Sequence, residues 1–214
     1  MGSYQNKMNY KKIQEEEKKT WLIEDPIIRN EKSMREKIRY PILKKQMGLN
    51  SLDTSNMVVF DIGAGPLGGV STVVNCKSVY RIDPLGDEYG KYFPCKDYTI
   101  MQAEDIDERL KEADLIIVTN ALDHFEDPEH FLHDLNRFSK PSCYFAHLHA
   151  INNAISHPHP AHEHNLNPEN LWKILKNDWE CCWYMDFMQD GLTYGWLKQP
   201  AFSGLYRKTT GYSK

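Results

Sequence analysis

The chain has 214 residues, of which 41% are hydrophobic and 26% are charged, and its formal net charge is −4. This composition is that of a globular protein with room for one α/β domain and one small appendage, and it excludes a disordered or fibrous chain. No apolar run approaches the roughly 18 residues that a membrane-spanning helix needs, and the first residues lack the apolar core of a signal peptide. We therefore expect a cytoplasmic protein without a membrane partner.

The first 50 residues are polar and charge-rich, with apolar residues at spacings of three, four and seven. This pattern predicts helices, which we expect to break near Pro26 and Pro41 and to end near Gly48. We therefore divide the chain into an N-terminal helical appendage, residues 1–50, and an α/β domain, residues 51–214. The five cysteines form no C-x-x-C pair, so they indicate neither a disulfide framework nor a zinc ribbon.

From residue 57 onward, short apolar runs alternate with helical stretches. The alternation predicts a mostly parallel sheet with helices on both faces, and the absence of a clear helix between the last two strands predicts a C-terminal antiparallel hairpin. The predicted strands are Met57–Asp61, Val79–Asp83, Tyr98–Met101, Leu115–Thr119, Cys143–His147, Glu180–Phe187 and Phe202–Arg207. The predicted helices are Leu67–Asn75, Asp105–Lys111, Pro128–Phe138 and Pro168–Lys176.

The strongest motif is a glycine-rich turn within Val58–Gly69, VVFDIGAGPLGG. Glycines in such a turn let the backbone approach a ligand closely, and a turn that follows a strand of an open α/β sheet lies at the ligand-binding edge. The spacing Gly63-x-Gly65-x-x-Gly68, with Asp83 at the end of the second strand, also matches a dinucleotide-binding fingerprint.

Three features favour S-adenosylmethionine over a dinucleotide. Asp61 precedes the first glycine by two residues, where its carboxylate suits a cationic amino acid tail better than a pyrophosphate. Pro66 removes a backbone N–H from the phosphate-facing start of the following segment. Only about 130 residues follow the second strand, which leaves little room for the separate substrate domain that a dehydrogenase usually carries.

Four segments in order, DIGAGPLGG, YRIDPLG, QAEDID and ADLIIVTNALDHFEDP, resemble successive motifs of the class I, Rossmann-like S-adenosylmethionine-dependent methyltransferases. The resemblance covers about residues 57–140 and assigns no motif to the first 50 residues. It implies a Rossmann-like seven-stranded sheet, S-adenosylmethionine as the cofactor of the domain 51–214, and an N-terminal helical lid in which Arg39 and Tyr40 contact the substrate.

The same resemblance implies which residues hold the cofactor. An Asp that is often found where Gln102 stands is missing here, so whether Gln102, Glu104 or a backbone group meets the adenine amine stays open. The implied set is Asp61, Gly63, Ala64 and Gly65 around the amino acid part, Asp83 at the ribose, Pro84, Ala103, Glu104 and Asp105 around the adenine, and Asn120 and Ala121 beside the methionine portion.

Histidine is the obvious base for an acceptor that must lose a proton, because its pKa is near neutral. Six of the nine histidines lie within residues 147–164, and strand alternation places the first two of them on one face at the ligand-binding edge. Another histidine follows the fourth predicted strand. The candidate catalytic residues are His124, His147 and His149, and further candidate substrate-binding residues are Asp123, His162 and His164.

Two alternatives for the histidine cluster stay open. Imidazoles beside Glu163 suit a metal ion, but their spacing fits no ligand motif, and we assign no metal; a polar loop with water-facing histidines is the other reading. The sequence thus predicts an enzyme that transfers a methyl group from S-adenosylmethionine to oxygen or nitrogen of a small-molecule acceptor. The acidic body argues against nucleic acid. An NAD(P)-dependent oxidoreductase and a non-catalytic S-adenosylmethionine-binding protein are the alternatives.

Overall fold

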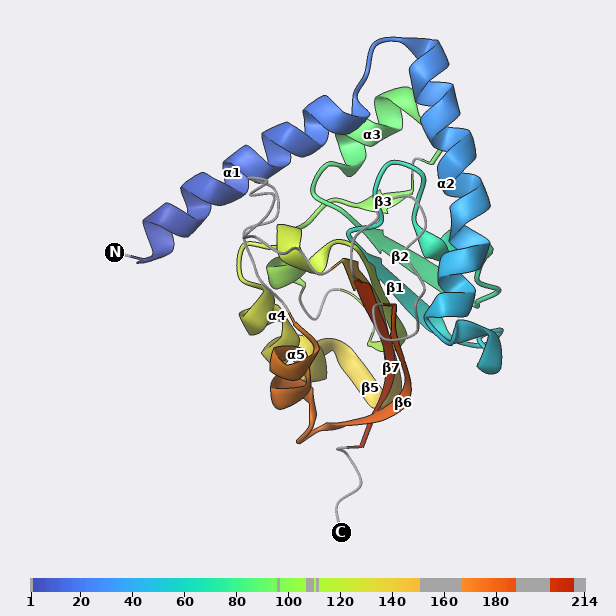
Figure 1. The fold of residues 1–214 in the computed structure, drawn as a ribbon, viewed down its shortest axis with the longest axis vertical. Coiled ribbons are helices and arrows are strands. Elements are labelled where there is room, and N and C mark those ends of the chain that lie inside the picture. Colours follow the sequence, from blue (N-terminus) through green and yellow to red (C-terminus); the bar gives the residue numbers. More distant parts are fainter. Residues whose placement is uncertain are drawn as a thin grey trace.

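The computed structural model describes residues 2–95, 97–106, 110, 112–150, 167–187 and 201–209. Seven strands form one sheet in the order β3-β2-β1-β4-β5-β7-β6 (Figure 1). The strands are β1 (Val58–Ile62), β2 (Ser78–Ile82), β3 (Tyr98–Thr99), β4 (Ala113–Thr119), β5 (Ser139–Ala150), β6 (Trp179–Asp186) and β7 (Ala201–Lys208).

The first five strands pair in parallel, and β7 lies antiparallel between β5 and β6. The predicted sheet, mostly parallel with an antiparallel C-terminal pair, is confirmed. The order also separates this chain from the dinucleotide-binding Rossmann sheet, whose strands run 3-2-1-4-5-6 without such an insertion.

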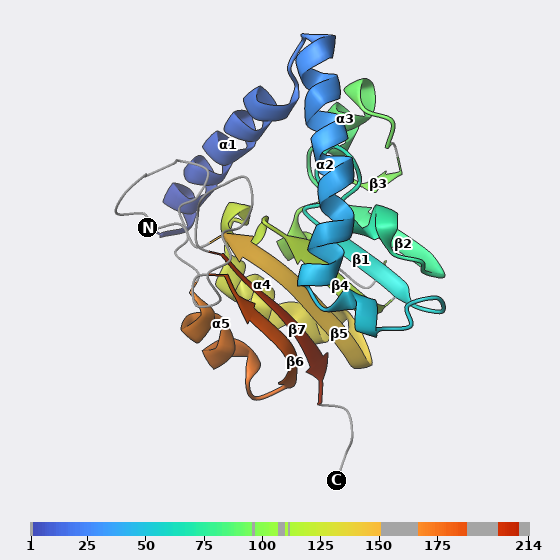
Figure 2. The same ribbon diagram turned by 45° about the vertical axis from the view of Figure 1, so that its right-hand side comes forward.

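Apolar residues on both faces of the central strands explain why helices cover the sheet on both sides. On one face, Phe60 and Val118 pack with α4 (Pro128–Asp134) and α5 (Pro168–Leu175). On the other face, Val59 and Ile117 pack with α2 (Pro26–Gln46). Figure 2 shows α2 running across β1 and β4, with α4 and α5 on the opposite side.

Three helices begin where an Asx residue precedes a proline. Asp25, Asp127 and Asn167 cap α2, α4 and α5, and each accepts a hydrogen bond from a backbone N–H of the first turn. The proline that follows lacks a backbone N–H, but the first N–H groups of a helix have no acceptor within the helix, so no hydrogen bond is lost. An Asx-Pro pair is therefore a strong helix start. The remaining helices are α1 (Gly2–Trp21), α3 (Gly86–Tyr92) and the 3-10 segments η1 (Leu49–Ser51), η2 (Val70–Val73), η3 (Ala103–Asp105), η4 (Leu122–His124) and η5 (Leu135–Phe138).

Three helix expectations need correction or restriction, and one helix was missed. Pro41 does not break α2: it is exposed, so the carbonyl that loses its hydrogen bond can be solvated. The helix predicted over Leu67–Asn75 is wrong, because Gly68 and Gly69 have φ values of 79° and 68°, which no α-helix contains, and η2 alone follows. Helix α3, which carries two glycines, was not predicted. Of the helix predicted over Asp105–Lys111, residues 107–109 and 111 lie outside the described residues.

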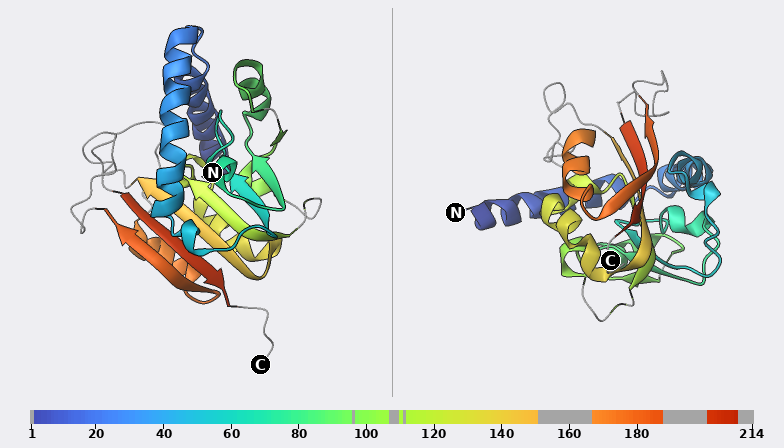
Figure 3. Two further views of the ribbon diagram at one scale, coloured as in Figure 1. Left: turned by 90° about the vertical axis from the view of Figure 1, so that its right-hand side faces the viewer. Right: turned by 90° about the horizontal axis from the view of Figure 1, so that it is seen from below.

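Helices α1 and α2 meet in a V above the carboxyl ends of the parallel strands (Figure 1). The N-terminal end of α1 projects away from the rest of the molecule (Figure 3). No helix in the described part of the chain is both long and apolar enough to cross a membrane.

Candidate functional site

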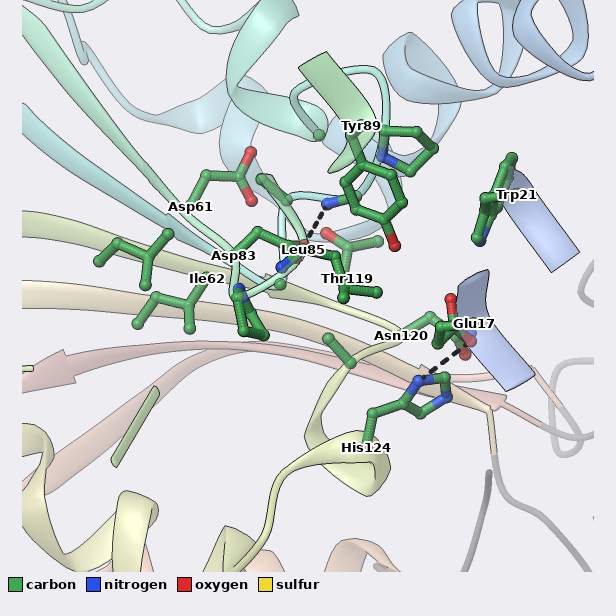
Figure 4. Close-up of a pocket in the computed structure, with 18 of the residues that line it drawn as sticks. Glu17, Trp21, Asp61, Ile62, Asp83, Leu85, Tyr89, Thr119, Asn120 and His124 are labelled. Atoms are coloured by element: carbon green, nitrogen blue, oxygen red, sulfur yellow. Dashed lines mark hydrogen bonds and ion pairs between the residues drawn. The ribbon is translucent and has the colours of Figure 1, made fainter. Parts of the chain in front are cut away.

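A cavity of about 360 Å³ lies at the carboxyl ends of β1, β2 and β4, under a roof formed by α1 and α2 (Figure 4). Open α/β sheets bind ligands at this edge, and the volume is within the range of small-molecule sites. The floor consists of the glycine turn after β1 and the loops that follow β2, β3 and β4. The cavity therefore brings together segments from the four motifs that the sequence singles out.

The glycine turn needs two of its glycines for different reasons. Gly63 has φ of 67°, and a Cβ there would lie 2.3 Å from the Cβ of Ala121, so both conformation and space require glycine. Gly65 has φ of 64° and faces open space. Its N–H donates to Asp83 and its carbonyl accepts from the Tyr98 hydroxyl at 2.7 Å, so the turn is held at both polar groups.

Asp61 is a buried carboxylate in the wall of the cavity. Its Oδ2 accepts a hydrogen bond from the N–H of Ser71 at 2.7 Å, whereas Oδ1 has no hydrogen-bond partner among the residues that the structure describes. Burial raises the pKa of this carboxyl to about 6. A buried acceptor beside the glycine turn favours a cationic ligand group and disfavours a diphosphate.

Asp83 follows β2 and ties the glycine turn to the start of α3. Its Oδ2 accepts from the N–H of Gly65 and its Oδ1 from the N–H of Leu85, both at 2.9 Å. Burial raises the pKa of this carboxyl to about 6 as well. Each carboxylate oxygen has a second lone pair, so Asp83 keeps capacity for two hydroxyl donors from a ligand.

The segment after β3 lines the cavity only in part. Ala103 and Glu104 reach the cavity, as does Pro84 from the loop after β2, whereas Gln102 and Asp105 are not in its lining and Asp105 is exposed. Glu104 accepts from the N–H of Asp127 at 3.1 Å, and burial raises its pKa. Of the two side chains left open for an adenine amine, only Glu104 borders the cavity.

Asn120 and Ala121 border the cavity directly after β4. Asn120 has φ of 51°, and its N–H donates to the Leu148 carbonyl at 2.7 Å. Its side-chain Oδ1 is buried without a hydrogen-bond partner in the described ranges. A strained backbone and an unsatisfied buried acceptor in one residue are typical of a binding site.

His124 reaches the cavity from η4, with a carboxylate on each side of its ring. Nδ1 lies 3.3 Å from Oε1 of Glu17 on α1, as Figure 4 shows, and Nε2 lies 3.7 Å from Oδ1 of Asp123. The same Asp123 oxygen is 3.7 Å from Nδ1 of His149. Asp123 and His149 are buried outside the cavity lining, and among the described residues His124 connects them to the cavity.

His147 lies in an aromatic cluster, outside the cavity lining. Its ring stacks on Tyr206 at 5.7 Å and on Phe145 at 5.6 Å, and it meets the edge of Phe202. Burial, with a smaller contribution from His149, lowers its pKa to about 3. Of the three candidate catalytic histidines, only His124 borders the cavity; His162 and His164 lie outside the described residues.

Three residues that the sequence analysis did not assign to the site also line the cavity. Glu17 and Trp21 of α1 line the cavity, as does Tyr89 of α3. From α2, Arg39 and Tyr40 line the cavity, their contact with a substrate stays a prediction, and Arg39 pairs with Glu36 at 3.2 Å. No local motif marked the α1 residues, since their role follows only from the path of the helix over the sheet.

Within the described ranges, no group of three or more His, Cys, Asp or Glu side chains is placed to hold a metal ion. No protein-family model and no curated protein matches the sequence.

Solved structures match the fold. The N-methyltransferase NodS from Bradyrhizobium japonicum WM9, in complex with S-adenosyl-L-homocysteine, has a TM-score of 0.61 at 14% identity, covering 94% of this chain and 98% of NodS. A chain of the complex between the Haloferax volcanii Trm112 methyltransferase activator and a methyltransferase has a TM-score of 0.62 at 12% identity, covering 83% of this chain and 93% of that chain.

The chain therefore has the fold of class I S-adenosylmethionine-dependent methyltransferases, as the motif resemblance implies. The same fold occurs in the cyclase SpnF, with a TM-score of 0.56 at 13% identity, covering 79% of each chain. Because one fold serves methyltransferases and a cyclase, the reaction must be argued from the site.

Proposed function

We propose that the chain is an S-adenosylmethionine-dependent methyltransferase that methylates oxygen or nitrogen of a small-molecule acceptor. Residues 1–50 act as the lid of a cofactor-binding domain formed by residues 51–214. The observation that carries the proposal is Asp61, a buried carboxylate with an unsatisfied oxygen beside the glycine turn. Such a group suits the ammonium of a zwitterionic amino acid tail.

The residues of the cavity fit the rest of this cofactor. Asp83 has free acceptor capacity for two ribose hydroxyls. Ala103 and Glu104 offer an apolar surface and a carboxylate to an adenine with its amine, and Asn120 offers its unsatisfied Oδ1 beside the amino acid portion. When bound, S-adenosylmethionine supplies an electrophilic methyl group on a sulfonium that leaves without protonation.

A dinucleotide fits the same cavity poorly. A diphosphate is normally held by backbone N–H groups at the start of an α-helix that follows the glycine turn. Here the turn leads into the four-residue η2, and Pro66 lacks an N–H. Asp61 would place a buried negative charge beside that diphosphate. These three features favour the sulfonium nucleoside over NAD or NADP.

His124 is the base that this geometry favours. Nδ1, on the Glu17 side of the ring, takes the acceptor proton after the acceptor displaces the Glu17 carboxylate from this nitrogen, and the nearby carboxylate then stabilises the imidazolium that forms. Asp123, buried behind the ring at 3.7 Å from Nε2, orients the imidazole as the carboxylate of a catalytic triad does. The separation exceeds a direct hydrogen bond, and such contacts often shorten when a ligand binds.

Calorimetric titration with S-adenosyl-L-homocysteine, NAD and NADP tests the cofactor. We expect binding of S-adenosyl-L-homocysteine and no heat from either dinucleotide; the reverse result refutes the proposal. Incubation with methyl-labelled S-adenosylmethionine and a panel of small alcohols, phenols and amines then tests the reaction. A protein that binds the cofactor but labels no acceptor would be a binding protein or an enzyme with another reaction.

A further inference from the structure

The outward face of α2 carries an apolar stripe. Met34, Ile38 and Ile42 are 57%, 63% and 48% exposed, and they are spaced four residues apart along one side of the helix. The opposite side of α2 packs on the sheet through Tyr40 and Leu43. Figure 3, left, shows α2 on the outside of the molecule. Single exposed apolar residues are common, but a continuous stripe indicates a contact surface.

Ile27, 70% exposed, lies nearer the start of α2 on this face, and from Glu31 to Lys45 the order of residues is self-complementary. Ile38 is at the centre, with Met34 four residues before it and Ile42 four residues after it. Seven residues before Ile38 stands Glu31, and seven residues after it stands Lys45, both exposed on the same face. Within the part of the chain that the structure describes, neither side chain forms an ion pair. An antiparallel copy of this helix would therefore oppose apolar to apolar along the stripe and acid to base at its two ends, with the exposed Arg35 of each copy opposite Pro41 of the other.

We propose that two copies of this chain associate through α2 about a twofold axis at Ile38. In this isologous interface Ile38 meets its own copy, Met34 meets Ile42, and Glu31 meets Lys45. The stretch from Glu31 to Lys45 spans roughly 21 Å of helix. A contact of one helix pair buries less than the roughly 1,200 Å² of a stable interface, so the dimer is reversible, with a Kd of about 1 to 100 μM.

The helix that forms the proposed interface also carries Arg39 and Tyr40 on its inner side, where they line the cavity. The inference does not depend on methyl transfer, since the stripe lies outside the cavity. Sedimentation equilibrium of the full chain between about 1 and 300 μM tests it, over the concentration range in which a reversible dimer of this size forms. We expect a concentration-dependent dimer for the wild type and a monomer for Ile38→Glu.

Two matched controls locate the contact. Ile100→Glu removes another exposed isoleucine, 44% exposed after β3 and away from α2, and we expect it to dimerise like the wild type. Glu31→Lys and Lys45→Glu each place like charges across the axis, so each weakens association about fivefold or more, and the double reversal restores it. Recovery of the dimer in the double variant distinguishes a lost contact from misfolding, because a second substitution would not repair a misfolded protein.

A further variant tests the twofold axis itself. Under mild oxidation Ile38→Cys forms a disulfide-linked dimer, because the axis brings the two copies of residue 38 together. The wild type, with its exposed Cys181 and Cys182, is the control for cross-links elsewhere. The proposal is overturned if the wild type stays monomeric over the whole concentration range, in which case this face would bind a different protein. It is also overturned if the double charge reversal fails to restore the dimer.

Discussion

At the scale of single residues, the site is built around two buried carboxylates, Asp61 and Asp83. Burial raises the pKa of both from 3.8 to about 6, because a charge is poorly solvated in the protein interior. The free protein therefore loses stability to keep these groups ionised at neutral pH. Such a cost is typical of groups kept for binding rather than for folding.

Asp61→Asn separates binding from stability. The amide keeps an acceptor for the N–H of Ser71 and removes the charge that faces the cavity. We expect affinity for S-adenosyl-L-homocysteine to fall roughly 10- to 100-fold, the equivalent of one charge-assisted hydrogen bond. The free energy of unfolding of the free protein should stay equal or rise by roughly 1 to 3 kcal/mol. Calorimetry and urea unfolding measure the two quantities, with the exposed Asp53→Asn as the control; a large loss of stability would contradict this assignment.

The raised pKa values also predict opposite pH trends for stability and binding. Between about pH 4 and pH 6 the folded chain holds protons that the unfolded chain has released, so the contribution of Asp61 and Asp83 to the free energy of unfolding falls as the pH rises. Affinity for a cationic ligand rises over the same window, because the ligand prefers the ionised carboxylate. Titrations with S-adenosyl-L-homocysteine at pH 5 and pH 7 should therefore show tighter binding at pH 7, with proton release at pH 5. Equal affinities at both pH values would speak against Asp61 as the partner of the amino group.

Two histidines with different surroundings allow a direct comparison. His147→Phe removes two buried ring nitrogens without a hydrogen-bond partner among the described residues, so stability should be maintained or increased. Methyl transfer should be unchanged. His124→Gln should lower kcat by roughly 10²- to 10⁴-fold, as for loss of a general base, with little change in S-adenosyl-L-homocysteine affinity. Single-turnover assays with an acceptor from the panel measure the effect. Loss of activity in His147→Phe would mean that His147 on β5, rather than His124, takes part in catalysis.

At the scale of elements, the glycine turn replaces the helix that commonly follows β1. Gly68 and Gly69 stop a helix from starting, and the longer α2 covers the adjoining face of the sheet instead. The edge of the sheet at which the cofactor would bind is thus formed by a hydrogen-bonded turn, and the helices that cover this turn are distant from it in sequence. Its shape depends on the close approach of Gly63 to Ala121.

Gly63→Ala tests this close approach against a matched glycine. The new methyl group would lie 2.3 Å from the Cβ of Ala121 and adopt a positive φ, so we expect a loss of about 2 to 4 kcal/mol in the free energy of unfolding. Gly90→Ala in α3 meets nothing within 4 Å and should stabilise the protein by about 0.5 to 1 kcal/mol. Urea unfolding of both variants gives the comparison, and equal effects would mean that the turn tolerates a side chain.

At the scale of the whole molecule, the roof is attached less firmly than the sheet. Among the side chains of α1 that the structure describes, Tyr10 and Ile13 are buried, and the others are half-buried or exposed. The β4 strand, in contrast, lies in the middle of the sheet between β1 and β5. Local opening therefore costs less free energy in α1 than in the core.

A ligand that bridges floor and roof should protect α1 from hydrogen exchange. Since Glu17 and Trp21 line the cavity, saturating S-adenosyl-L-homocysteine should slow exchange of the amides in the second half of α1 by about tenfold or more. Amides of β4 exchange through global opening and should change only with overall stability. Mass spectrometry of peptides from both elements measures this, and unchanged exchange in α1 would show that residues 1–50 are not a lid.

The sequence alone determined the strands, the antiparallel C-terminal pair and the helix starts at Pro128 and Pro168, because these depend on local patterns of apolar residues and on backbone chemistry. It also marked the residues after β1, β2 and β4, since the ends of parallel strands meet at one edge whatever the rest of the chain does. The absence of a helix after the glycine turn also has a local cause, the consecutive glycines at positions 68 and 69. The sequence analysis nevertheless predicted a helix there, because strands and helices alternate along the rest of the domain.

Only the tertiary structure decided which histidine borders the cavity. Strand alternation placed His147 and His149 on one face, yet that face of β5 is covered by aromatic side chains from β7, which come from the end of the chain. It also decided that Glu17, with no motif around it, lies across from His124. Both outcomes depend on which segments pack together over more than 50 residues of separation, and no local pattern of residues contains that information.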